Sequence, residues 1–142
     1  MENGGQLSPR QVALIRAAIE PGWRADTSWK ASIWIADRPS TGQCAVTSML
    51  VQDVLGGDLV HTTVNGIPHF FNRLPSGQEI DLTRDQFDPP LRIVGHDIAP
   101  RSRLNHSTST VQRYQRLRSR VGAELEHVVT ERMVTVAGRS VA

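Results

Sequence analysis

Apolar residues recur at helical spacing near the start of the chain. Ser8, Pro9 and Gln11 form a typical helix start, because a serine cap, a proline in the first turn and a glutamine three residues after the cap satisfy or avoid the free backbone N–H groups. Pro21-Gly22 ends the pattern, so a first helix is predicted between these signals. Its apolar stripe consists of Val12, Leu14, Ile15, Ala18 and Ile19.

A second helix is predicted from about Gly42 to Leu55. Its apolar face is broad enough for a central, buried helix. Ser40 or Thr41 is expected to cap its beginning, and Gly56-Gly57 supplies its end. The apolar face consists of Ala45, Val46, Met49, Leu50 and Val54.

The second half of the chain begins with short strand patterns and closes with a helix. Strands are predicted at 58–64, 69–74 and 78–83, joined by the hairpin signal Asn65-Gly66 and the turn Pro75-Ser76-Gly77. Residues 84–106 read as loop, with Leu91–Val94 as a candidate short strand. A last helix is predicted from Ser107–Thr110 to about Met133, with an apolar stripe of Tyr114, Leu117, Val121, Leu125 and Val128.

These elements predict an α+β fold, in which a central helix packs on a small antiparallel sheet between N- and C-terminal helices. At 142 residues, a single domain spanning 1–142 is expected, with flexible termini at 1–7 and 134–142. The irregular segment 23–38 carries Trp23, Trp29 and Trp34, and we expect it to anchor itself on the core by burying their indoles.

Composition narrows the possible partners. The formal net charge is only +2, and Lys30 is the single lysine among 16 basic residues. The arginine run at 113, 116, 118 and 120 is therefore interpreted as a solvated helix face, and nucleic acid is an improbable partner. We expect a cytoplasmic protein without a membrane segment, because the chain shows no signal-peptide pattern, no bilayer-length apolar run and a single cysteine.

That cysteine, Cys44, follows a loop of turn-forming residues and is expected in the first turn of the second helix. The free N–H groups and the helix dipole at such a position favour a thiolate, which is the nucleophilic form of cysteine. A nucleophilic cysteine also needs a base within hydrogen-bond reach, and the base needs an orienting group.

His69 and Asp81 are the best candidates for base and orienter. If Pro75-Ser76-Gly77 is a three-residue loop, Leu74 lies opposite Gln78, and His69 and Asp81 become diagonal neighbours on one face of the sheet. A loop of two or four residues would place them on opposite faces. The spacing therefore predicts a Cys44–His69–Asp81 triad on the condition of an odd loop.

Two other interpretations of these residues stay open. A lone buried cysteine is usually a small hydrophobic residue, and a histidine beside proline in a hairpin is usually structural. A zinc site built from Cys44, His61, His69 and Asp81 is a poor rival, because the chain has no second cysteine and no close pair of histidines. His61 should also pair with Phe70 across the Asn65-Gly66 turn, on the face opposite His69. We expect no metal and no cofactor.

Gly42-Gln43-Cys44 at a helix start, His69 at the start of a strand and Asp81-Leu82-Thr83 at the end of the next resemble the core of transglutaminase-like and papain-like cysteine enzymes. Almost the whole chain resembles the YunG-like family of small bacterial proteins. That second resemblance rests on Trp23, Asp26-Thr27, 42–47, Gln52-Asp53, Gly56-Gly57, 69–74, 77–83, Gln86-Phe87, Arg113-Tyr114 and Leu117.

The first resemblance implies a thiol hydrolase or acyltransferase that acts on a protein, a peptide or a small amide through a thioester acyl-enzyme. Papain-like enzymes carry an oxyanion-binding glutamine upstream of the cysteine, where this chain has Arg38. Gln43, Trp34 and Asn72 are the remaining candidates for contacts with substrate or oxyanion. The alternative is a catalytically inactive binding module with the same core.

Overall fold

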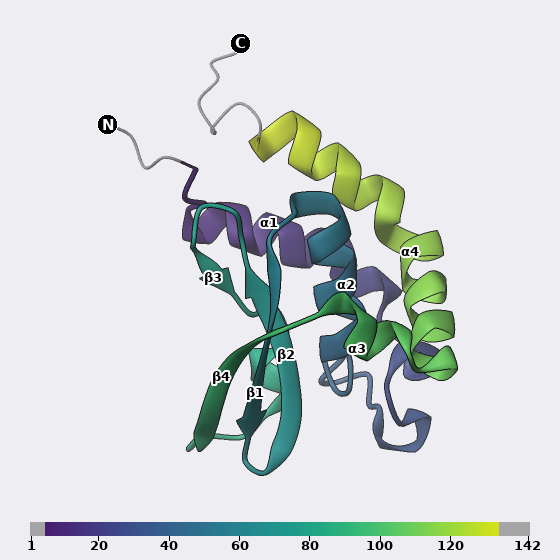
Figure 1. Cartoon of the computed structure of the whole chain (residues 1–142). Coiled ribbons are helices and arrows are strands. Elements are labelled where there is room, and N and C mark those ends of the chain that lie inside the picture. The colour runs from purple at the N-terminus through teal and green to yellow at the C-terminus, as the bar shows by residue number, and fades with distance from the viewer. Residues whose placement is uncertain (1–4, 134–142) are drawn as a thin grey trace.

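The computed structural model describes residues 5–133, which form an antiparallel sheet packed against helices (Figure 1). The predicted α+β class is thereby confirmed. The predicted flexible segments 1–7 and 134–142 lie largely outside the described residues. The helices are α1 (Pro9–Ile19), α2 (Cys44–Leu55), α3 (Arg101–Asn105) and α4 (Thr108–Val128), which continues as a π-helical turn, Val129–Met133; short 3-10 turns occupy Glu20–Gly22, Ala25–Thr27, Ala31–Ile33 and Arg84–Gln86.

The sheet contains four strands in the order β3-β2-β1-β4, and every neighbouring pair is antiparallel. α2 lies between the sheet and α4, with α1 across the same side (Figure 1). Because both sides of α2 are covered, the broad apolar face predicted for it forms the centre of the core. The strands are β1 (Asp58–Val64), β2 (Ile67–Arg73), β3 (Glu79–Ile80) and β4 (Ile93–Ala99).

The first helix begins as predicted. The Ser8 hydroxyl accepts a hydrogen bond from the Gln11 N–H (3.1 Å), and the Gln11 side chain accepts one from the Ser8 N–H (2.8 Å). This reciprocal capping box satisfies two backbone donors that the helix itself cannot pair.

Replacing Ser8 with alanine removes the cap and is expected to lower the free energy of unfolding by about 1 kcal/mol. Urea unfolding followed by circular dichroism measures the change. Ser102→Ala is the control, since the Ser102 side chain is exposed and makes no hydrogen bond among the described residues. Equal stabilities of the two variants would contradict the capping role.

The beginning of α2 differs from the prediction. The helix starts at Cys44 rather than near Gly42, and its N-cap is Gln43, whose side chain makes no capping bond. Neither predicted cap acts as one: the Thr41 hydroxyl donates to the Arg38 carbonyl (2.7 Å), and the Ser40 hydroxyl is buried without a partner. Cys44 is therefore the first helical residue and not the third, which brings it closer to the positive end of the helix dipole.

Both hairpin registers agree with the sequence. Val64 pairs with Ile67 across the two-residue Asn65-Gly66 turn, and His61 pairs with Phe70. In the next hairpin Asn72 pairs with Ile80 and Arg73 with Glu79, which is the register of a three-residue turn. The predicted third strand was too long, because pairing stops at Ile80.

The interpretation of residues 84–106 as loop was wrong for most of that segment. Ile93–Ala99 forms the edge strand β4, whose start overlaps the candidate strand Leu91–Val94, and α3 follows it. Every residue of β4 except Ala99 is exposed, so its side chains show none of the alternation that marks a half-buried strand. A register shift opposite His61–Thr63 and a positive φ at Gly95 (87°) interrupt it further.

The three tryptophans do not share one role. Trp23 is buried, and its indole N–H donates to the Thr47 hydroxyl (2.8 Å), as expected for an anchor. Trp34 is half-buried. Trp29 is 58% exposed, so the prediction that it anchors the segment was wrong. Among residues 5–133, no helix has the length and apolar character needed to cross a membrane.

Candidate active site

The loop before α2 holds Cys44 in a fixed place. Gly42 has a positive φ (74°), and a side chain there would collide with Ser28 Oγ and come within 3.0 Å of the Trp29 ring. Its N–H donates to the Gln86 side chain (3.0 Å), and its carbonyl accepts from the Trp29 N–H (2.9 Å). The close approach of two neighbouring segments therefore requires glycine at this position.

His69 and Asp81 meet as the hairpin register predicts. The His69 Nε2 and an Asp81 carboxylate oxygen lie 2.7 Å apart. The side chain of His69 is fully buried, and that of Asp81 is only 10% exposed. Since pairing ends at Ile80, the Asp81 backbone is free to turn its carboxylate toward the imidazole across the diagonal.

The second ring nitrogen of His69 is left for the thiol. Nδ1 is buried and has no hydrogen-bond partner, whereas Nε2 is engaged by Asp81. Burial by itself lowers the pKa of His69, but the hydrogen bond to Asp81 and the nearby Cys44 outweigh it and raise that pKa to about 9. The structure thus brings the three predicted site residues together from α2, β2 and the segment after β3.

Asp81 has a further partner that the sequence did not reveal. The Arg84 Nε donates to the same carboxylate oxygen (2.7 Å), and the Thr83 N–H donates to the other one (3.2 Å). Burial raises the pKa of Asp81, but the hydrogen bonds from His69 and Arg84 prevail and lower it. The spacing Asp81-x-x-Arg84 was a usable signal, because residues three apart become neighbours in a helical turn.

Aromatic rings enclose the imidazole. Phe87 meets the His69 ring edge-on (5.0 Å between centroids), and Phe71 stacks against it (6.2 Å). The Arg84 guanidinium covers the outer side of Phe71 at 5.7 Å. These contacts restrict the orientation of the imidazole and exclude water from its bond to Asp81.

The three residues considered for the oxyanion have their N–H groups directed to backbone carbonyls. The Gln43 amide donates to the Arg24 carbonyl (3.0 Å), the Trp34 indole to that of Pro39 (2.9 Å) and the Asn72 amide to that of Ser48 (3.0 Å). Gln43 and Asn72 are also buried. These contacts hold the loop before α2 and fasten the sheet to α2.

The rival zinc set is not assembled. His61 and Phe70 are a cross-strand pair with ring centroids 5.1 Å apart, on the face of the sheet opposite His69. Within residues 5–133, no group of three or more His, Cys, Asp or Glu side chains is arranged so that it could hold a metal ion.

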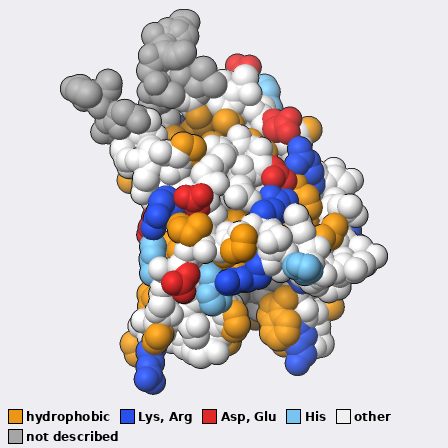
Figure 2. Space-filling model, viewed as in Figure 1, with side chains coloured by type: hydrophobic (Ala, Val, Ile, Leu, Met, Phe, Trp, Pro, Cys, Tyr) orange, Lys and Arg blue, Asp and Glu red, His pale blue; other side chains and the backbone are white. Residues whose placement is uncertain are grey.

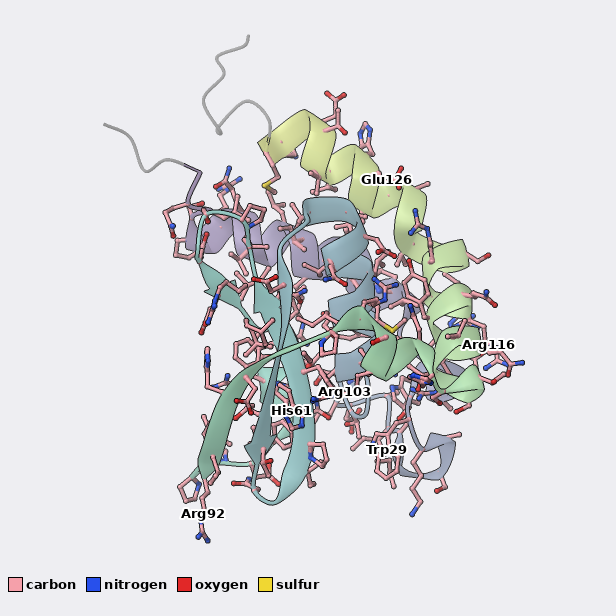
Figure 3. The ribbon with its side chains drawn as sticks, viewed as in Figure 1. Trp29, His61, Arg92, Arg103, Arg116 and Glu126 are labelled. Atoms are coloured by element: carbon pink, nitrogen blue, oxygen red, sulfur yellow. The ribbon has the colours of Figure 1, made fainter. Side chains whose placement is uncertain are left out.

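A cavity of about 260 Å³ opens beside Cys44. Its walls come from the loop before α2, from α2 itself, and from β2, α3 and α4. They are mostly apolar: Trp29, Gly42, Cys44, Ala45, Ile67, Pro68, Phe70, Leu104, Thr110 and Arg113. Basic, histidine and apolar side chains gather in the lower half of the view in Figure 2. Figure 3 shows Arg103 between His61 on β1 and Trp29 at that end of the molecule.

Arg113 contradicts the prediction of a solvated arginine face. It is half-buried in the wall of this cavity, whereas Arg116, on the next turn of α4, is exposed and points outward in Figure 3. Sequence periodicity could not separate the two, because three-residue spacing places both near one side of a helix.

The comparisons with known proteins agree on one family. The model of the YunG protein family matches residues 11–126. The chain is also 30% identical over 118 residues to "Uncharacterized protein YunG" of Bacillus subtilis (strain 168), covering 82% of this chain and 96% of that one. The chain belongs to the YunG family. The family match contains all three site residues, Cys44, His69 and Asp81, and the cavity beside them. No solved structure matches the chain.

Proposed function

We propose that this YunG-family protein is a thiol hydrolase or acyltransferase with a papain-like or transglutaminase-like core. The observation that carries the proposal is the His69–Asp81 pair, with the second imidazole nitrogen left for Cys44 at the start of α2. A nucleophile, a base and an orienting carboxylate in this order are the parts that acyl transfer requires.

The raised pKa of His69 means that its Nδ1 already holds the thiol proton before the reaction, and the Cys44 sulfur then attacks the carbonyl carbon of an amide or ester. The new C–S bond gives a tetrahedral intermediate. As it collapses, the bond to the amine or alcohol breaks, and His69 returns the proton to that leaving group. Asp81 holds the other ring nitrogen protonated and stabilises the imidazolium.

The product of this step is a thioester on Cys44. Water or an amine then attacks the thioester carbonyl, His69 takes the proton of the attacking group, and the C–S bond breaks to regenerate the thiol. Water as the acceptor makes the protein a peptidase, amidase or deamidase, and an amine makes it transglutaminase-like.

The oxyanion of the intermediate needs hydrogen-bond donors. The Cys44 N–H is in the first turn of α2, where backbone N–H groups have no acceptor within the helix. It therefore supplies one donor and a share of the helix dipole, which favours negative charge at this end.

Reaction with p-nitrophenyl acetate tests the proposal. Wild-type protein is expected to release p-nitrophenolate in a burst and to gain one acetyl group, located on Cys44 by peptide mass analysis. Hydroxylamine should remove the acetyl group, since thioesters react readily with it. Cys44→Ala is the control that should show neither burst nor adduct. Acetylation confined to lysine or histidine side chains would contradict the proposal.

One observation favours the second candidate, a binding module that keeps the fold without the reaction. Gln43, Trp34 and Asn72 all donate their side-chain N–H groups to backbone carbonyl oxygens. None of the three therefore supplies a second hydrogen bond to the oxyanion beside that of the Cys44 N–H. Such a module would take up no acetyl group at Cys44 beyond the rate of a free thiol.

A further inference from the structure

The cavity beside Cys44 combines apolar walls with a single charged side chain, that of Arg113. Apolar side chains line it from several elements, among them Phe70 on β2, Leu104 on α3 and Trp29 in the loop. At about 260 Å³ the cavity is smaller than the sites that hold large ligands, so it fits one small group.

Arg113 lacks the partner that a half-buried guanidinium usually has. Its guanidinium donates hydrogen bonds to two neutral oxygens, the Thr110 hydroxyl (2.9 Å) and the Thr27 carbonyl (3.5 Å). No carboxylate lies within ion-pair distance of it among residues 5–133, and no acidic residue lines the cavity. Burial lowers the pKa of Arg113 and outweighs the opposite effect of Cys44.

The neighbouring surface adds to the positive charge. Arg103 at the same end of the molecule makes no side-chain bond within the described part of the chain (Figure 3). Its charge reaches His61, whose pKa is lowered first by burial and then by Arg103. Asp97, opposite His61 on β4, acts on the same histidine with the opposite sign, so Arg113 in the cavity wall is the group that gives a small anion its attachment point.

We propose that the cavity takes acyl substrates bearing a carboxylate, and that Arg113 binds this carboxylate while Cys44 attacks the neighbouring carbonyl carbon. A guanidinium presents five N–H donors in a planar fork that matches the two oxygens of a carboxylate. The apolar walls then accommodate the short hydrocarbon part of the same substrate. This inference deepens the proposed function and rests on it.

Two alkylating reagents of nearly equal size, iodoacetate and iodoacetamide, test the charge preference. In both reactions the Cys44 sulfur displaces iodide and forms a C–S bond, but only iodoacetate carries a carboxylate. The measured quantity is the ratio of the two second-order rates. In Arg113→Gln this ratio is expected to fall about tenfold relative to wild type, since a charge-assisted hydrogen bond is lost.

Arg116→Gln is the matched control, because it removes the same charge one turn further along α4 on an exposed side chain. Its ratio should stay within about twofold of wild type, since solvent and salt screen an exposed charge outside the cavity. Arg113→Lys should keep most of the preference. Circular dichroism and the melting temperature of each variant establish that the fold is retained.

A second measurement does not depend on the reactivity of the thiol. Butyrate should protect Cys44 from iodoacetamide in wild type and protect Arg113→Gln about tenfold less well, while butyramide should protect neither. A ratio and a protection that are unchanged in Arg113→Gln would overturn the inference.

The failure of this inference and that of the proposed function give different results. If His69→Gln lowers the iodoacetate preference and Arg113→Gln does not, the anion is attracted by the imidazolium, and only the role of Arg113 is lost. If Arg113→Gln abolishes protection by butyrate while Cys44 never forms a thioester, the carboxylate site stands and the reaction does not.

Discussion

His69→Gln is expected to slow the acetylation of Cys44 by about 10²- to 10⁴-fold, which is the usual contribution of a general base. Asp81 holds one nitrogen of the imidazole, and Cys44 is among the groups that raise its pKa. Glutamine fills a similar volume but cannot exchange a proton at neutral pH. Stopped-flow release of p-nitrophenolate under single-turnover conditions measures the rate.

His96→Gln provides the matched control. His96 also bonds to a carboxylate, with its Nε2 2.8 Å from Glu79, but it lies on the exposed strand β4. Its replacement should leave the acetylation rate within about twofold. Equal rates for wild type and His69→Gln would mean that Cys44 reacts as an isolated thiol, and the proposed mechanism would be abandoned.

Asp81→Asn is expected to lower the free energy of unfolding by about 3 kcal/mol at pH 6, because it leaves the buried, protonated His69 without its counter-charge. The His69 pKa is raised from 6.5 to about 9, so the stabilisation by the pair is complete below pH 6.5 and is lost as the pH rises through about 9. The difference between wild type and variant should therefore narrow to about 1 kcal/mol at pH 10, where the partly exposed Arg84 pair remains.

At low pH the contribution of Asp81 to stability changes with pH in the opposite direction. The pKa of Asp81 is lowered from its ordinary 3.8, so its contribution is present above that value and disappears as the pH falls through the lowered one. Urea unfolding at pH 6 and at pH 10 measures the two differences in stability between wild type and Asp81→Asn. Glu79→Gln is the control, since Glu79 contacts a histidine and an arginine on the exposed edge and should cost less than about 1 kcal/mol. An Asp81→Asn cost no greater than this would contradict the buried ion pair.

Local sequence signals predicted most of the elements because those elements carry strong local chemistry. The Ser8 capping box, the Asn65-Gly66 turn and the stripe of α4 all depend on residues close together in the chain. β4 was predicted only at its start, by the candidate strand Leu91–Val94, because an exposed edge strand has no apolar face to alternate. The start of α2 was misplaced because Thr41 bonds backward to Arg38 instead of capping.

The residues of the candidate site also divide into those that local sequence signals could place and those that they could not. His69 and Asp81 could be paired from turn length alone, because a hairpin converts spacing into geometry. Arg113 could not be placed in the site, since its contact with the cavity depends on how α4 crosses the loop before α2. Trp29 was misjudged for a related reason: its backbone N–H is tied to Gly42, which leaves the indole at the rim rather than in the core.

The short pairing of β3 makes the length of the Pro75-Ser76-Gly77 turn decisive for the His69–Asp81 pair. Only two residue pairs fix the relation of β3 to β2, so the sheet itself could absorb a change in the length of this turn. A chain with one residue more or fewer in this turn would keep its core and its nucleophile, but the base His69 and the orienting carboxylate of Asp81 would lie on opposite faces of the sheet. Only a turn with an odd number of residues keeps His69 and Asp81 on the same face of the sheet.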